Sequence, residues 1–450
     1  MLRKYVYKLS PTQIIVSAYF TAIVIITGLL MLPISVKPGV NLSLIDALFT
    51  AASAVSVTGL TTVSTADTFS TFGSFVLMLA FQIGGIGVMT LGTFFWILFG
   101  APIGLSQRRL IMIDQNRYNL SGLVQLMKLV LGMTLLFEAV GTLIFGLYFY
   151  FAGYYDTFYA SFYNAVFHSI STYTDAGFDL FGNSLIDYSH DYFVQSVTML
   201  LIILGAIGFP VLVEVREYLF GGHNRFRFSL YTKITTVTFL VLLVLGMLVI
   251  WITEDSRYFA EMSWYEKFFH SLFLSVTARS AGLTTVDVSE LSVGSQFVTS
   301  ILMFIGASPS SVGGGIRTTT LAVVILMIVT FARGRSEVRV FGRSIRQEDI
   351  IKSFVFFVTA LMLVTGGTLV VHMLEDQRFE LVHVIFEVCS AFGTCGLSVG
   401  ITSGLSYSSK IILVLLMYIG RIGMMPFLSS FTSGKSTADV HYPKEKIIIG

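Results

Sequence analysis

Long apolar segments alternate along the chain with shorter apolar segments and polar loops. A helix needs about 20 apolar residues to cross a bilayer. Segments of that length lie at 13–34, 72–99, 129–152, 192–215, 230–252, 295–331, 352–374 and 408–432. Shorter ones lie at 44–57, 160–173, 264–277 and 379–391. At about a dozen residues these are too short to span a membrane, so we interpret them as re-entrant half-helices.

The same order of elements occurs four times: a long helix, a short helix, a glycine turn and a second long helix. The turns read SVTGL, TDAGF, RSAGL and GTCGL, and their glycines are 118, 105 and 114 residues apart. Spacing this regular indicates internal duplication. Ten residues before each turn glycine lies a bulky apolar residue: Phe49, Phe167, Leu272 or Phe386.

This pattern predicts an all-α polytopic membrane protein. Four membrane–pore-loop–membrane repeats would surround a pseudo-fourfold pore, with eight spanning helices and four re-entrant pore helices. The predicted repeats cover residues 1–107, 108–226, 227–346 and 347–433, and residues 434–450 would form a cytoplasmic tail.

Composition supports a membrane location. The chain of 450 residues is 54% hydrophobic and 12% charged, with a mean hydropathy of +0.80. Soluble domains are about a quarter charged. No small-residue cleavage site follows the first apolar segment, so we expect it to be a retained helix. Two cysteines, Cys389 and Cys395, cannot build a disulfide framework.

Basic residues predict the orientation. Of the 28 lysines and arginines, 19 lie at the two termini and at the three joints between repeats. By the positive-inside rule these five places are cytoplasmic. An even number of spans agrees with both termini being inside, and the glycine turns would then open outward.

Acidic residues surround the glycine turns on the predicted outer side. They are Asp46, Asp67, Asp156, Asp175, Asp179, Asp187, Asp191, Glu254, Asp255, Glu261, Glu266, Asp287, Glu290, Glu375, Asp376, Glu380 and Glu387. A vestibule with this charge would concentrate cations. The alternative is that these residues only solvate the outer loops.

The glycine turns have the chemistry of a cation filter. Irregular backbone at membrane depth is tolerated where it lines a watery cavity or is buried in protein. Glycine adopts the positive φ angles that turn carbonyls toward one axis. A ring of such carbonyls replaces the hydration shell of an alkali cation, and the C-terminal ends of the short helices add negative potential. Any one turn alone would be interpreted more simply as a small-residue turn or a helix-packing contact.

The sixth long segment is interrupted. A helix from Gly294 to Arg333 would be about 60 Å long, twice the hydrocarbon thickness. Its middle reads GASPSSVGGGIRTTT, and this composition of glycine and proline breaks helices. We predict an intramembrane loop at 306–320 that gates the pore. The alternative is a static kink filled by packing.

Few charged residues lie within the apolar segments. Arg421 is predicted to act as an electrostatic barrier or to anchor the gate, with snorkelling to the interface as the alternative. Glu138 is expected to pair with a neighbouring helix. Arg279 is expected to brace the third turn against an acid. His168 and His270 lack the spacing of a metal site and are interpreted as packing and hydrogen-bonding residues.

The glycine turns, the broken sixth segment and the GRIG sequence of the last segment resemble the Ktr/Trk/HKT superfamily of K⁺ transporters, in particular the membrane subunit of bacterial Ktr systems. The resemblance covers essentially the whole chain. In that family a glycine in all four turns accompanies K⁺ preference. One departure is Asp175, where relatives often have asparagine, and it would attract cations.

The resemblance implies potassium uptake with K⁺ bound at filter carbonyls, Na⁺ as an activator, and no organic cofactor. It implies a homodimer in the plasma membrane, surrounded by lipid and controlled by a cytoplasmic nucleotide-binding ring subunit, with no role for nucleic acid. Expected filter residues are Val57, Thr58, Gly59, Asp175, Ala176, Gly177, Ser280, Ala281, Gly282, Thr394, Cys395 and Gly396. Expected gate residues are Gly306, Ala307, Ser308, Pro309, Ser310, Ser311, Gly313, Gly314, Gly315, Arg317, Thr318 and Arg421.

Two other functions remain to be compared with potassium uptake. A Na⁺-permeable or cation-symporting protein would keep the same architecture, with Asp175 as its support. An intramembrane enzyme would need paired catalytic groups, and the apolar segments carry no Ser/His/Asp or His/Glu cluster. We therefore expect a transporter and not an enzyme.

Overall fold

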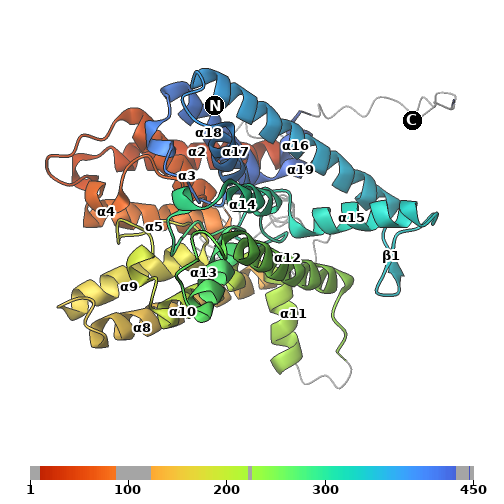
Figure 1. Ribbon diagram of the computed structural model, residues 1–450, viewed down its shortest axis with the longest axis horizontal. Coiled ribbons are helices and arrows are strands. Elements are labelled where there is room, and N and C mark those ends of the chain that lie inside the picture. The colour runs from red at the N-terminus through yellow and green to blue at the C-terminus, as the bar shows by residue number, and fades with distance from the viewer. Residues whose placement is uncertain (1–10, 88–122, 221–225, 432–444, 446–450) are drawn as a thin grey trace.

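The computed structural model describes residues 11–87, 123–220, 226–431 and 445, and this part of the chain is mainly helical (Figure 1). Four continuous helices within it are long and apolar enough to cross a membrane. They are α2 (Pro11–Leu30), α8 (Leu123–Phe151), α12 (Leu230–Glu254) and α16 (Gln347–Leu374). Protein atoms bury only 22–44% of the most apolar part of each helix. Their remaining surface needs an apolar surrounding.

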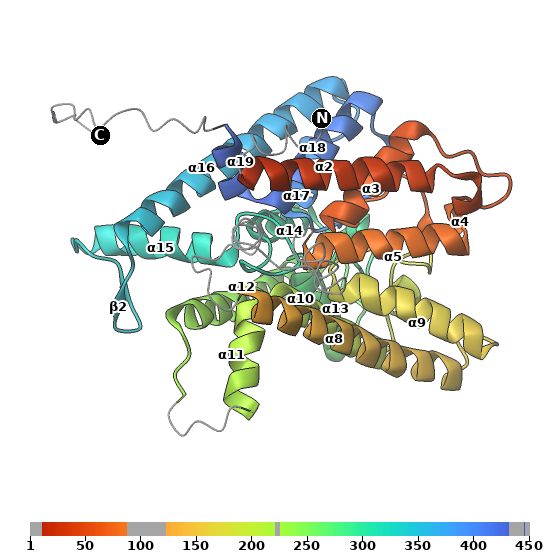
Figure 2. The ribbon, with the colours of Figure 1, turned by 180° about the vertical axis from the view of Figure 1, so that it is seen from behind.

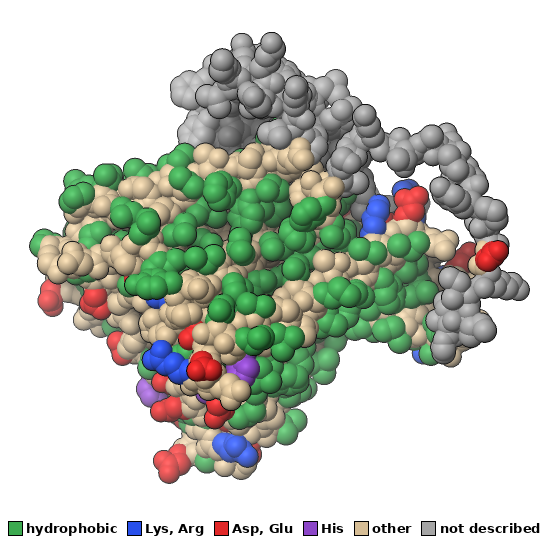
Figure 3. Space-filling view, turned by 90° about the horizontal axis from the view of Figure 1, so that it is seen from above, with side chains coloured by type: hydrophobic (Ala, Val, Ile, Leu, Met, Phe, Trp, Pro, Cys, Tyr) green, Lys and Arg blue, Asp and Glu red, His purple; other side chains and the backbone are tan. Residues whose placement is uncertain are grey.

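Hydrophobic side chains cover the middle of the molecular face in Figure 3, and charged side chains gather toward its edges and lower tip. Exposed apolar residues on the long helices include Phe20 and Ile25 on α2, and Leu240 on α12. A continuous apolar belt with charged margins is the surface expected of a multi-pass membrane protein.

Four short helices end just before the glycine turns: α3 (Leu44–Ser56), α9 (Phe158–Tyr173), α13 (Trp264–Thr277) and α17 (Leu381–Gly393). Side chains cap three of their N-termini. Ser43 and Thr157 accept hydrogen bonds from the first turns of α3 and α9, and Ser263 and Glu266 form a capping box on α13. The caps fix where these three helices begin, and the glycine turns fix where all four short helices end.

The short helices are packed inside the molecule, and their bulky apolar residues are largely buried. The three phenylalanines that lie ten residues before the turn glycines, in α3, α9 and α17, are at most 1% exposed. Leu272 of α13, which has the equivalent position, is half-buried.

A second helix follows each glycine turn: α5 (Thr71–Ile86), α10 (Tyr192–Ala206), α14 (Val293–Ile305) and α18 (Tyr407–Ile422). Each packs against the short helix of the next predicted repeat. Thus α5 contacts α9, α10 contacts α13, α14 contacts α17, and α18 returns to contact α3. The contacts form a closed cycle, and α19 (Met424–Ser430) packs against α2 (Figures 1 and 2).

The second helices are less regular than the apolar pattern predicts. The break in the sixth segment lies where we expected it, between α14 and α15 (Thr318–Ala332). Two other segments, expected to be continuous at 192–215 and 408–432, are also broken. Helix α10 meets α11 (Phe209–Phe220) at a bend of 103°, and α18 meets α19 (Met424–Ser430) at 105°.

Of the eight expected spans, four are unbroken helices in the described residues, and up to six are present there if each bent pair of helices is one span. The first part of the expected segment 72–99 is α5, which ends at Ile86, and residues 88–99 lie outside the described part of the chain.

Short elements complete the described fold. They are α4 (Thr65–Thr68), η1 (Pro33–Ser35), η2 (Ile186–Tyr188), η3 (Val288–Glu290), η4 (Thr402–Gly404), β1 (Arg339–Val340) and β2 (Arg343–Ser344). The two strands form an antiparallel hairpin in the basic loop between α15 and α16, with Arg339 opposite Ser344. An all-α prediction did not include this hairpin.

One ion pair connects the last repeat to the first. The Nζ of Lys410 in α18 lies 3.0 Å from Oδ1 of Asp46 in α3, and the side chains are 9% and 19% exposed. The Ser43 hydroxyl donates to the other carboxylate oxygen of Asp46 at 2.5 Å. This pair reinforces the contact that closes the cycle.

We expect Lys410→Met to lower the free energy of unfolding by about 1–3 kcal/mol, because it leaves the Asp46 carboxylate without its cation in a largely buried place. Thermal unfolding of the purified protein in detergent would measure the loss. The double variant Asp46→Asn/Lys410→Met removes both charges and should recover part of the stability. A single variant as stable as the parent would show that the pair contributes nothing.

Candidate functional site

The four glycine turns converge at the centre of the molecule. Their glycines all adopt positive φ angles, +92° at Gly59, +72° at Gly177, +71° at Gly282 and +97° at Gly396. Other residues rarely adopt this left-handed conformation, so the sequence needs glycine at these positions. We call these four residues the glycine ring.

Close approaches around the glycine ring follow the order of the chain. A Cβ atom added to Gly59 would lie 2.8 Å from the carbonyl oxygen of Ala176, beside Gly177. The same addition at Gly177 would collide with the carbonyl of Ala281. At Gly282 and Gly396 it would collide with the carbonyls of the next turns in order: those of Cys395 and Thr58. Each turn therefore touches the next one, and the fourth touches the first.

The carbonyls in these contacts have no hydrogen-bond donors among the described residues. Within the described residues, no backbone or side-chain group donates to the carbonyl oxygens of Thr58, Ala176, Ala281 or Cys395. Buried carbonyls nearly always have a partner. Four unpaired carbonyls, one from each turn of a closed ring, form an arrangement that binds a dehydrated cation.

Hydroxyl groups of the short helices hold the turns in place. The Oγ of Ser53 accepts from the N–H of Gly59 at 3.1 Å, and Ser390 accepts in the same way from Gly396 at 3.0 Å. In the other two turns the hydroxyls donate to carbonyls that follow the glycine: Ser171 to Phe178 and Thr277 to Leu283, both at 2.6 Å. These bonds fix the turns without using the ring carbonyls.

An open hollow of about 490 Å³ lies against one side of the glycine ring, and all four glycines line it. Two carboxylates, Asp179 and Asp287, also line it. Other acidic residues predicted for the vestibule have structural partners. Glu254 and Glu375 accept from the backbone N–H groups of Ser292 and Ser406 at the starts of α14 and α18. The acidic bias of the sequence is thus partly a helix-capping device.

The loop between α14 and α15 lies against the other side of the ring. A Cβ added to Gly313 would collide with the hydroxyl of Ser280, and one added to Gly314 would lie 2.5 Å from Oγ1 of Thr394. Residues Val312–Gly314, which we call the crest, are therefore in contact with the bases of two turns. The predicted gate segment lies immediately below the ring.

Broken helices provide the bonds that hold this loop. The end of α10 leaves its last carbonyls free, and those of Gly205 and Ala206 accept from the N–H groups of Val312 and Ser308. At the bend, a Cβ on Gly208 would lie 2.8 Å from the carbonyl oxygen of Pro309. The same carbonyl accepts a hydrogen bond from the hydroxyl of Tyr231 at 2.5 Å.

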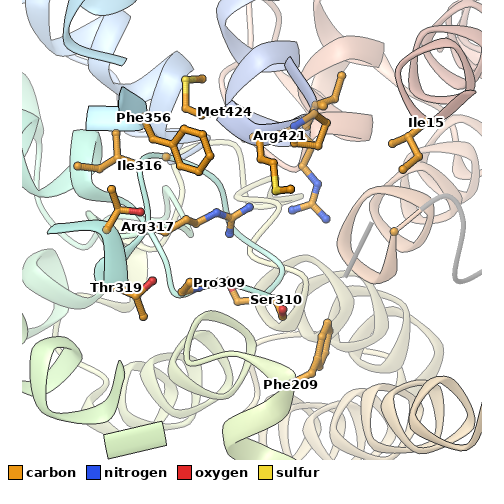
Figure 4. Close-up of a pocket in the computed structure, with 18 of the residues that line it drawn as sticks. Ile15, Phe209, Pro309, Ser310, Ile316, Arg317, Thr319, Phe356, Arg421 and Met424 are labelled. Carbon is orange, nitrogen blue, oxygen red and sulfur yellow. The ribbon is translucent and has the colours of Figure 1, made fainter. Parts of the chain in front are cut away.

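Two arginines also hold the loop. Arg421 of α18 donates to the carbonyl of Val312 and to those of Gly84 and Gly85 at the end of α5. Arg317 donates to the carbonyls of Ser308, at 3.1 Å, and Gly313. Both guanidinium groups line a cavity of about 120 Å³ beneath the loop (Figure 4). Arg421 is thus buried and hydrogen-bonded both to the loop and to the end of α5.

The other charged residues are placed as follows. Glu138 accepts from the side-chain amide of Gln82 in α5, with both oxygens at 2.7 Å, so it pairs with a neighbouring helix as expected. Arg279 does not brace an acid. It donates to the carbonyl of Phe239 at 2.7 Å and stacks on the ring of that residue. That expectation was wrong because a backbone carbonyl and an aromatic face replace the carboxylate.

Both histidines make hydrogen bonds within the packed interior. His168 contacts the hydroxyl of Thr198 at 3.1 Å, and His270 contacts that of Thr285 at 2.9 Å. No group of three or more metal-binding side chains is present among the residues that were described.

Sequence reasoning missed the bends at Gly208 and Gly423. Each glycine has a positive φ angle, and proline follows within three residues, at Pro210 and Pro426. Both prolines lie in the first turn of the next helix. Backbone N–H groups in a first turn have no partner within the helix, so the missing N–H of proline costs no hydrogen bond there. Glycine followed closely by proline inside an apolar segment was the available signal.

Comparisons with known proteins find matches over almost the whole chain. The family model "TrkH: Cation transport protein" matches residues 4–438. The chain is 52% identical to the Ktr system potassium uptake protein D of Bacillus subtilis over 447 residues, covering 99% of each chain. It is 32% identical to the potassium/sodium uptake protein NtpJ of Enterococcus hirae, covering 98% of each.

A solved structure shares the fold. The crystal structure of the potassium transporter TrkH from Vibrio parahaemolyticus matches with a TM-score of 0.73 at 20% sequence identity. The match covers 94% of this chain and 85% of that one.

We expect Gly396→Ala to lower the free energy of unfolding by about 1–3 kcal/mol, because alanine is strained at this φ and its Cβ collides with the carbonyl of Thr58. Thermal unfolding in detergent would measure this. Gly28→Ala is the control, since nothing lies within 4 Å of its added Cβ and alanine suits a helix. Equal melting temperatures for the two variants would contradict a tightly closed ring.

Proposed function

This chain belongs to the TrkH family of cation transport proteins, and from that membership we propose that it takes up K⁺ through the glycine ring. It is a multi-pass membrane transporter and not an enzyme. The proposal assigns the ring carbonyls to K⁺ selectivity, the 306–320 loop to gating, and control to a separate cytoplasmic subunit.

The closed order of the four turns is the observation that carries the proposal. Each turn touches the next through a glycine and a carbonyl, and those carbonyls lack donors within the described residues. A cation at the centre would provide the partner that these buried groups need. The short helices end at the same place and add their negative ends to the attraction.

Ions would enter from the hollow that contains Asp179 and Asp287. They would lose water at the ring, pass the 306–320 loop and reach the cavity beside Arg317 and Arg421. We infer that the termini are cytoplasmic, so that an inside-negative membrane potential drives uptake. The gain is about 2.3 kcal/mol per charge for each 100 mV.

Gating by the loop is supported by its contacts. The crest lies against Ser280 and Thr394, and only hydrogen bonds and packing hold it there. Loss of the bonds from Arg421 and Arg317 would let a glycine-rich segment move. One arginine comes from the loop itself and the other from the fourth predicted repeat, so movements of α18 would reach the gate directly.

We also infer a cytoplasmic nucleotide-binding ring subunit as the regulator, and a homodimer of the membrane subunit. The basic loop that carries the hairpin supports such contact. Its exposed arginines are Arg333, Arg335, Arg339, Arg343 and Arg346. Figure 2 shows the hairpin extending away from the helices. Na⁺ as an activator belongs to the same proposal.

One observation favours an alternative. Asp175 places a buried carboxylate in the second turn, and one relative is named a potassium/sodium uptake protein. A Na⁺-permeable or cation-symporting transporter would have the same ring. Competition by Na⁺ and K⁺ against the uptake of radioactive Rb⁺ separates the two, since equal competition would favour the alternative.

We expect Gly59→Ser to reduce discrimination between K⁺ and Na⁺, because its Cβ would lie 2.8 Å from the carbonyl oxygen of Ala176 and would displace that carbonyl. A loss of about 1–3 kcal/mol of selectivity corresponds to roughly 5- to 150-fold. Rb⁺ uptake by cells or vesicles, measured with each competing ion, would detect it. Gly28→Ser, in the exposed part of α2, is the control. Unchanged selectivity in Gly59→Ser would argue against the ring as the filter.

We expect removal of Gly313–Gly315 to increase ion flux, because it deletes most of the crest beneath the ring. Arg421→Gln should also increase flux, since it removes the donors to Val312 and α5. Arg333→Gln is the matched control, because Arg333 is exposed at the far end of α15. Flux into vesicles without a regulatory subunit would be the measurement. Parental flux in both gate variants would refute an obstructing loop.

A further inference from the structure

The residues two positions before the ring glycines form a second, unequal layer. They are Val57, Asp175, Ser280 and Thr394, which we call the inner ring. All four are fully buried. Val57, Asp175 and Thr394 have left-handed φ angles of 58°, 54° and 48°, so the backbone is turned in the same way in three of the four turns.

Three members of the inner ring carry polar atoms without partners. Neither carboxylate oxygen of Asp175 has a hydrogen-bond partner within the described residues, and the same holds for the hydroxyls of Ser280 and Thr394. The Ser280 hydroxyl and, without a direct ion pair, the charge of Arg421 nevertheless lie within interaction range of the Asp175 carboxylate. A buried carboxylate with no directly bound cation or hydrogen-bond donor is strongly unfavourable. Four oxygen atoms from three turns therefore need a ligand.

These oxygens face the gate side of the ring. The crest contacts the hydroxyls of Ser280 and Thr394 through Gly313 and Gly314. The carboxylate of Asp175 lies beside Gly205 of α10, where an added Cβ would be 3.3 Å from Oδ1 and 3.0 Å from a methyl group of Val312. All three side chains thus border the same crest.

The crest offers a cation no free oxygen in this conformation. Its three carbonyls accept hydrogen bonds from other groups. Arg421 donates to Val312, Arg317 donates to Gly313, and the N–H of Ala307 donates to Gly314 at 3.1 Å. The crest therefore closes the site from below without completing the coordination of an ion.

We propose that the inner ring is a separate binding site for a monovalent cation, formed by the carboxylate of Asp175 and the hydroxyls of Ser280 and Thr394. It rests on the proposed function, because the ion reaches it through the glycine ring. The ligands are oxygens only, with one negative charge, which suits Na⁺ or K⁺. Val57 leaves the first quadrant without a ligand, so the ion lies off the axis, toward the second to fourth turns.

This site would couple ion occupancy to the gate. An ion bound by the three side chains lacks ligands on the side of the crest, and water can supply them only when the crest moves away. The ion therefore binds better to the open conformation, and by linkage its binding favours opening. An ion bound beside Asp175 would therefore help to release the 306–320 loop.

The test is the anomalous signal of Tl⁺ in crystals of the complete protein. We expect two peaks in the parent protein, one at the glycine ring and one beside Asp175. In Asp175→Asn the second peak should disappear or fall at least about tenfold in occupancy at limiting Tl⁺, because the negative charge is lost. The peak at the glycine ring shows that the variant is folded.

Asp179→Asn is the matched control. It removes an equal charge four residues later, in the outer hollow, and its side-chain oxygen still accepts from the N–H of Gly182. Both peaks should remain in this variant. Ser280→Ala and Thr394→Val should each weaken the second peak less than Asp175→Asn does, because each removes a neutral ligand.

The outcomes separate this inference from the proposed function. A ring peak without a peak beside Asp175 in the parent, or a second peak that survives in Asp175→Asn, overturns the inner site and leaves the filter standing. The absence of any peak at the glycine ring overturns the filter instead. Binding of Tl⁺ to the detergent-solubilised protein, measured by calorimetry, should show a second class of site that Asp175→Asn alone removes.

Discussion

A backbone carbonyl inside a membrane needs a partner, and the centre of this molecule contains four that lack one within the described residues. The rest of the fold serves to hold those groups in place. Short helices position the turns, hydroxyls fix the turns through other atoms, and second helices pack each turn against the next. Under the proposed function, a cation that enters would offset the free energy needed to keep these carbonyls unpaired, and the ring would favour an ion that fits it.

Much of this arrangement was readable in the chain. The apolar periodicity, the four glycine turns and the break in the sixth segment predicted the short helices, the central position of the turns and a loop at 306–320. The structure has residues 306–317 outside the helices. These features depend on local chemistry: length of apolar segment, glycine at positive φ and proline in a helix. The alignment of the turns into a closed cycle needed the tertiary contacts.

Other features could not be read so directly. The bends at Gly208 and Gly423 depend on what packs beside them, because an isolated apolar segment with one glycine is also a good helix. Arg279 was assigned an acidic partner because charge attraction is the first expectation for a buried arginine. In the structure, the Arg279 guanidinium donates to the backbone carbonyl of Phe239 and stacks on its ring. Neither partner is charged, so a search of the sequence for acidic residues cannot find them.

The position of the 306–320 loop, the proposed gate, depends on one of those bends. Because α10 stops at Ala206, the carbonyls of Gly205 and Ala206 become available to the loop from the next predicted repeat. Helix breaking in the second repeat thus stabilises irregular backbone in the third, and Arg421 adds a bond from the fourth. Three parts of the chain that are far apart in sequence determine the position of a single loop.

The single covalent chain also permits differences that four identical subunits could not have. A substitution in a homotetramer is copied into every quadrant, so a bulky plug or a charge beside the axis would appear four times and crowd the passage. Here one quadrant carries Asp175, another the loop and a third Arg421. Asymmetry of this kind would let one loop close the central passage from one side. The other three repeats would not have to move together with it.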